Sequence, residues 1–111
     1  MKTDFVEIFQ TIRAAMQPYA TLGFANRENS DRTYDLWSDK NIKSGPDQRS
    51  ETFFASISAD QHEAVLKTNF GHEVLKGASV LKIKELDEEL MNQIEDALAV
   101  GYKLFKEKEW V

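Results

Sequence analysis

Residues 78–105, ASVLKIKELDEELMNQIEDALAVGYKLF, decide the fold, because the spacing of their apolar side chains changes once along the stretch. From Ala78 to Lys84 apolar and polar residues alternate, which is typical of a half-buried β-strand. Beyond Asp87 the apolar residues recur at steps of three and four, as on one side of an amphipathic helix: Leu90, Ile94, Ala97, Leu98, Gly101, Leu104 and Phe105. Asp87 is the expected N-cap, with Leu86 and Met91 packed across it. The stretch therefore predicts a strand that leads directly into a C-terminal helix.

Working outward, the rest of the chain supplies one more helix and further strands. Helical periodicity from Asp4 to Tyr19 predicts an N-terminal helix that begins at Thr3 or Asp4 and ends near Pro18. Between the helices the periodicity falls toward two, and polar segments separate short apolar runs. These runs predict strands over Leu22–Arg27, Arg32–Trp37, Glu51–Ala59 and Glu63–Phe70, with Asp60-Gln61-His62 turning a hairpin. A surface loop is expected over Asp39–Arg49, and a shorter connection over Gly71–Gly77.

This order of helix, four or five strands and helix predicts an α+β fold. Strands grouped between two helices form an antiparallel sheet, and both helices pack on one of its faces in an α-β(4-5)-α sandwich. A chain of 111 residues is the usual length of one domain, so residues 1–111 are expected to form a single unit.

Charge and composition exclude several classes of protein. The net charge is −5, and the whole excess lies in residues 85–111, which carry eight acids and three lysines. A nucleic-acid binder would need a basic surface instead. The chain contains no cysteine, which excludes disulfide scaffolds and thiolate metal sites. No apolar run approaches the ~20 residues of a membrane span, and we expect a cytoplasmic protein that binds neither membrane nor nucleic acid.

No catalytic motif accompanies this fold. The five glycines form neither of the common phosphate-binding patterns, and no serine lies in a nucleophile elbow. His62 and His72 each lie beside carboxylates in predicted turns or loops, where solvent exposure is the ordinary interpretation. We therefore do not expect an enzyme.

The acids around the start of the second helix form the first candidate site. Exposed carboxylates suit hard or borderline cations that keep part of their water shell. The candidate ligands are Glu85, Glu88, Glu89, Glu95 and Asp96. An equally good interpretation is structural, because acids in the first turn and lysines in the last turn both complement the helix macrodipole.

The aromatic residues form the second candidate site. Phe53 and Phe54 are adjacent in a predicted strand and so point to opposite faces, with Phe53 expected to share a face with Ala55 and Ile57. If the helices cover one face, the other face exposes aromatic rings to a partner, a small molecule or a second copy of the chain. The candidate binding residues on that open face are Tyr34, Trp37, Phe54 and Phe70.

Three stretches resemble a known family: DFVEIF (4–9) with MQPYA (16–20), FFA (53–55), and LKGASVLKIKELD (75–87) continued through GYK (101–103) to EWV (109–111). The chain is similar to the YdhG-like family of small bacterial proteins. That resemblance implies a frataxin-like α–β–α sandwich and, for some members, a role as an iron chaperone that delivers iron to iron–sulfur or haem assembly proteins. For this chain we expect a monomer or a weak homodimer.

Frataxins bind iron loosely through acids on the first helix and first strand, whereas this chain carries its acids on the second helix. No ligand is therefore carried over by position. Two hypotheses follow from the sequence. One is weak binding of divalent iron by the surface carboxylates, and the other is a non-metal interaction or small-molecule-binding module that uses the open face of the sheet.

Overall fold

The structure, a computed structural model, describes residues 2–38, 42–44, 47–49, 52–69 and 80–111. Within these residues the chain forms two α-helices, one near each end, with a short 3₁₀ helix and seven strands between them. In chain order the elements are α1 (Phe5–Met16), the 3₁₀ helix η1 (Gln17–Leu22), β1 (Phe24–Ala25), β2 (Thr33–Ser38), β3 (Ile42–Ser44), β4 (Asp47–Arg49), β5 (Thr52–Ala59), β6 (Ala64–Thr68), β7 (Val80–Ile83) and α2 (Glu88–Glu107).

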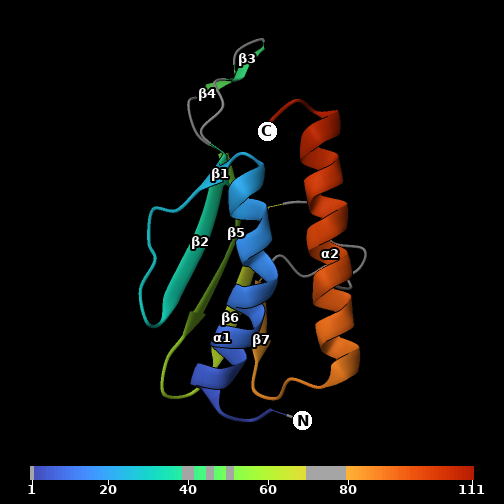
Figure 1. Ribbon diagram of the computed structural model, residues 1–111. Coiled ribbons are helices and arrows are strands. Elements are labelled where there is room, and N and C mark those ends of the chain that lie inside the picture. Colours follow the sequence, from blue (N-terminus) through green and yellow to red (C-terminus); the bar gives the residue numbers. More distant parts are fainter. Residues whose placement is uncertain (1, 39–41, 45–46, 50–51, 70–79) are drawn as a thin grey trace.

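Five of the strands form one antiparallel sheet in the order β1-β2-β5-β6-β7, and both α-helices lie on the same face of it (Figure 1). The core fills the space between the two layers. It joins inward residues of α1, such as Ile8 and Ile12, to inward residues of α2, such as Ile94 and Leu98, across the sheet. The predicted α+β sandwich is confirmed.

Both helices begin where the sequence predicts. The Asp4 carboxylate accepts hydrogen bonds from the backbone N–H groups of Val6 and Glu7, and the Asp87 carboxylate accepts one from Leu90 at 2.7 Å. α1 ends at Met16 rather than at Tyr19, because Pro18 has no N–H to continue the α-helical ladder. The chain tightens into η1 there and stops at Gly23, whose φ of 111° suits glycine.

Two strand predictions need correction. The strand expected over Leu22–Arg27 is reduced to the two residues of β1, because η1 occupies the chain up to Leu22. The loop expected over Asp39–Arg49 contains the pair β3–β4, in which Ile42 lies opposite Arg49. Three-residue strands with few apolar side chains carry no alternation that a sequence can reveal. The Gly71–Gly77 connection lies outside the described residues.

The longest strand, β5, contains a β-bulge at Phe54. Leu36 of β2 pairs with Ala55, but the next residue, Trp37, pairs with Phe53, so that Phe54 is an extra residue on β5. Phe54 and Ala55 consequently both face the helices and are fully buried, while Phe53 faces away and is half-buried. The predicted assignment of Phe53 to the inner face is wrong for this reason.

The Phe54 ring is the centre of an aromatic cluster at the β1 end of the sheet. It stacks on Phe24 of β1 with centroids 4.4 Å apart, and meets Phe105 of α2 edge-on at 5.0 Å. Tyr19 of η1 lies 6.0 Å away. Phe105 in turn contacts Trp110, whose carbonyl accepts a hydrogen bond from the Ser38 hydroxyl. The ring therefore joins the 3₁₀ helix, β1 and the C-terminal end of α2.

Replacing each of the two adjacent phenylalanines by alanine, one at a time, tests whether β5 contains the bulge or alternates regularly. Phe54→Ala removes a fully buried ring and should lower the free energy of unfolding by about 3–5 kcal/mol, as large core truncations do. Phe53→Ala removes a half-buried ring and should cost less than about half as much. Urea denaturation followed by tryptophan fluorescence measures both changes. Equal losses, or a larger loss for Phe53→Ala, would contradict the bulge.

Candidate functional site on the open face of the sheet

The face of the sheet that points away from α1 and α2 is the best-defined candidate surface, and is called the open face below (Figure 1). Residues directly opposite one another on antiparallel strands point to the same side, so the register assigns its members. Their side chains are half-buried or exposed apart from Asp35, and they are Thr33, Asp35 and Trp37 of β2, Phe53, Ser56 and Ser58 of β5, Val65 and Lys67 of β6, and Val80 and Lys82 of β7.

Trp37 is held in one orientation at the β1 end of the open face. Its indole Nε1–H donates a hydrogen bond to Asp35 Oδ2 at 3.1 Å. The Arg27 guanidinium carbon lies 4.1 Å from the centre of the indole ring, which is a cation–π contact, and the Phe53 ring centroid lies 5.1 Å away on the neighbouring strand. The indole is thus restrained by Asp35 at its N–H, by Arg27 over its ring and by Phe53 beside it.

Asp35 makes this arrangement possible because its carboxylate is buried and satisfied. The residue is only 8% exposed, and Oδ1 accepts the backbone N–H groups of Arg27 at 2.7 Å and Glu28 at 3.0 Å. The Asn26 side-chain amide donates to the Asp35 carbonyl, which closes the β1–β2 connection over the carboxylate. A buried charge is tolerated when it is hydrogen-bonded in this way. Asp35 therefore has a structural role, which is to tie the β1–β2 connection to Trp37.

The other end of the open face is aliphatic and cationic. In the register of β6 and β7, Lys67 lies opposite Val80 and Val65 lies opposite Lys82. Val80 is 49% exposed, and both lysines are exposed. Within the described residues the only ion pair is Lys2–Glu7 on the other side of the molecule, so neither lysine is neutralised there. Glu63 and Lys84, just beyond these strands, would form the next opposite pair and carry one charge of each sign.

The aromatic residues predicted to share the open face are separated by the structure. Trp37 lies there as expected, but Tyr34 is 2% exposed and faces the helices, because it is three positions away from Trp37 on β2 and has the opposite parity. Phe54 is turned inward by the bulge. Phe70 lies outside the described residues. Sequence reasoning missed Phe53 and Asp35, and it passed over the two lysines, although their alternation with apolar neighbours placed them outward.

The acids of the metal hypothesis are all exposed and fall into two rows along α2. Glu88 and Glu95 border the groove beside α1, and Glu89 and Asp96 border a shallow depression on the outer side, which Glu88 also lines. Members of a row are seven residues, or about 10 Å, apart along the helix. The positions three and four residues after Glu88 and Glu89 are Met91, Asn92 and Gln93, so no acid follows another at the spacing of direct neighbours on a helix surface.

Glu85 precedes the helix and is also exposed. Over the part of the chain that the structure describes, no three acidic or histidine side chains come close enough to hold a metal ion. Iron binding by these carboxylates remains a prediction from the sequence. Two of them, Glu88 and Glu89, lie in the first turn of α2, where the macrodipole also favours acids.

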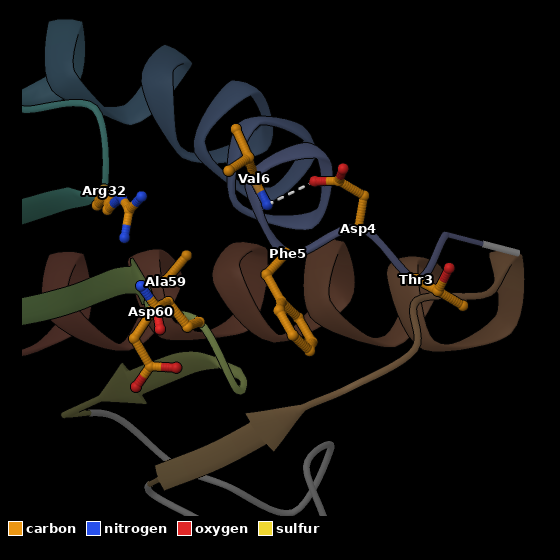
Figure 2. A pocket seen from close by; sticks show the side chains of 8 residues that line it. Thr3, Asp4, Phe5, Val6, Arg32, Ala59 and Asp60 are labelled. Atoms are coloured by element: carbon orange, nitrogen blue, oxygen red, sulfur yellow. Dashed lines mark hydrogen bonds between the residues drawn. The ribbon is translucent and has the colours of Figure 1, made fainter.

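A pocket of about 330 Å³ lies on the helical side, between the first turn of α1 and the β5–β6 turn (Figure 2). Arg32, Asp4 and Asp60 all line it, but both carboxylates already accept hydrogen bonds from backbone N–H groups. Asp4 caps α1, and Asp60 accepts the N–H groups of His62 and Glu63, which lower the pKa of its carboxyl group. The two carboxylates of this pocket therefore stabilise the first turn of α1 and the β5–β6 turn, and Arg32 is the one cation among the described residues that line it.

Comparisons of the chain with protein-family models, with curated proteins and with solved structures find no match. Among the described residues no helix is both long and apolar enough to cross a membrane.

The pKa of Tyr19 reports which row of acids lies beside α1 and η1, because the charge of Glu95 acts on it. Partial burial of the phenol raises the pKa of Tyr19 above its ordinary value of 10.0, and the charges of Glu95 and Tyr102 raise it further. Because the pKa is higher in the folded state, this group favours folding less as the pH rises past 10. Glu95→Gln should bring the Tyr19 pKa closer to 10, while Glu89→Gln, in the other row, should leave it unchanged. An NMR titration that follows the ¹³Cζ shift of Tyr19 between pH 8 and 12 measures this pKa. Equal changes of the pKa in the two variants would contradict the two-row arrangement.

Proposed function

We propose that the protein is a non-enzymatic binding domain that engages another protein through the open face of its sheet. The observation that carries the proposal is the fixed Trp37, which is oriented by Asp35, covered by the Arg27 guanidinium and flanked by Phe53. Tryptophan and arginine are the residue types that contribute most at the centres of protein interfaces.

The fixed orientation supports binding because ordering a side chain costs free energy when a complex forms. A tryptophan that is already held by a hydrogen bond and two ring contacts loses less conformational freedom on binding than a free one. The neighbouring half-buried Ser56 and Ser58 leave a shallow, polar strip along which a partner segment can lie.

The helical side offers less support for a binding function. Glu88 and Glu89 lie in the first turn of α2, where the helix dipole favours acids, and the pocket beside α1 contains the carboxylates of Asp4 and Asp60, which cap turns. Delivery of iron to iron–sulfur or haem assembly, which the resemblance to the YdhG-like family implies, would have to use carboxylates about 10 Å apart within each row. Such spacing permits at most one carboxylate per ion from each row.

A random twelve-residue peptide library displayed on phage tests the proposed surface without knowledge of the partner. We expect enriched peptides to shift the amide NMR signals of Trp37, Phe53 and Ser56 when added as synthetic peptides. Ser56→Tyr fills the middle of the open face without removing a contact of the core, and it should weaken these peptides at least tenfold. The matched control, Ala99→Tyr, adds the same side chain on the exposed side of α2 and should change affinity less than twofold.

Peptides that shift residues of α1 or α2 and bind the Ser56→Tyr variant unchanged would refute the proposed function. Enrichment that is no greater on the wild-type protein than on Ser56→Tyr would refute it equally. The two variants must first show the wild-type urea midpoint within experimental error, which separates blocked binding from lost folding.

A further inference from the structure

The chemistry of the open face also identifies the kind of partner it fits. Resting on the proposed function, we infer that the bound segment is an acidic stretch of another protein in which carboxylates alternate with apolar side chains. The inference depends on the charges of the strand residues and on their register, neither of which is needed for the proposal above.

The charge of the open face is opposite in sign to that of the chain as a whole. Its strand residues include the two exposed lysines, Lys67 and Lys82, and a single acid, Asp35. The Asp35 oxygens accept hydrogen bonds from two backbone N–H groups and from the indole of Trp37, and Asp35 forms no ion pair with either lysine. Nor does any described residue form an ion pair with them. The acidic excess of the chain lies instead in residues 85–111, most of which form α2 on the other side of the sheet.

The register then sets the spacing that a partner must match. Lys67 and Val65 alternate outward along β6, and Lys82 and Val80 do so along β7, with each lysine opposite a valine. The two lysines are therefore diagonal neighbours, as are the two valines. A segment that crosses this strip meets cationic and aliphatic positions in turn, so acidic and apolar side chains in alternation complement it. Trp37 and Phe53 extend the apolar contact at the other end of the face.

Nucleic acid fits this surface less well than an acidic peptide. Single-stranded nucleic acids bind sheets by stacking bases on open aromatic faces. The Arg27 guanidinium lies 4.1 Å above the indole of Trp37 and occupies one face of that ring. Two lysines are also a small footprint for a phosphate backbone, and the rest of the chain has an acidic excess.

The composition of the selected peptides tests the inference separately from the proposed function. We expect peptides that map to the open face to be rich in glutamate or aspartate and to contain apolar residues between them. Affinity of the best synthetic peptide, measured by fluorescence anisotropy, should fall tenfold or more in the Lys67→Glu/Lys82→Glu double variant. It should also fall severalfold when NaCl is raised from 50 to 300 mM. Lys103→Glu, a matched charge reversal on the exposed side of α2, should change it less than twofold.

Neutral or basic peptides that map to the open face would overturn the inference and leave the proposed function standing. An acidic peptide whose affinity is unaffected by the double charge reversal would do the same. Two competing occupants are tested in parallel: tighter binding of a dT₁₂ oligonucleotide than of the peptide would assign the face to single-stranded nucleic acid. Self-association in sedimentation that the double variant abolishes would assign it to the acidic helix of a second copy. Either result would overturn an acidic segment of another protein as the partner.

Discussion

The single extra residue in β5 is the constraint on which the rest of the structure depends. An unbroken strand would turn Phe54 away from the helices, opposite Trp37, and leave Phe53 inside. The bulge exchanges the two, at the cost of a local interruption of the ladder. In return the Phe54 ring reaches Phe24, Tyr19 and Phe105 at once. These residues come from β1, from η1 and from the last turns of α2. Within the described part of the chain, β1 has only two residues and one neighbouring strand, and the two helices make no backbone pairs with the sheet, so side-chain packing must hold all three elements in place. One buried ring therefore fixes how three short or terminal elements meet.

The same bulge determines the character of the open face. Because β5 gains a residue between its pairs with Leu36 and Trp37, Phe53 becomes the cross-strand partner of Trp37. Aromatic cross-strand pairs stabilise a sheet, here on the face that neither α1 nor α2 covers. Asp35, two positions earlier on β2, faces the same way as Trp37, and its carboxylate binds both the indole and the backbone of the β1–β2 connection. Core packing on one face and orientation of Trp37 on the other are thus two consequences of one register shift.

Elements that depend on a regular apolar period could be predicted from the sequence. The prediction failed where one extra residue, Phe54, interrupts the period of a strand. The stretch from Ala78 to Phe105 and the aspartate caps at Asp4 and Asp87 specify their elements locally, and the structure has both helices and the strand β7 there. The bulge is not visible in the sequence, because ETFFASISA reads as well in either register and only packing against Phe24 and Phe105 selects one. For the same reason the aromatic set was only partly right: Trp37 lies on the open face, but Tyr34 and Phe54 belong to the core. The network around Asp35 joins residues whose contacts arise from the path of a loop, which no periodicity encodes.

Different physical effects account for the acids at the beginning of α2 and for the two lysines of the open face. The lysines, and not these acids, support the proposed acidic partner because of this difference. Acids at the beginning of α2 stabilise the helix whatever else they do, since they face the positive end of its dipole. Lys67 and Lys82 have no such reason within the described structure: they lie in strands, diagonal to one another, with no ion-pair partner among the described residues. Lysine on an outer strand such as β7 does discourage sheets from joining edge to edge, but β6 is paired on both sides and needs no such protection. The proposed binding of an acidic segment at the open face would give both of these charges a partner.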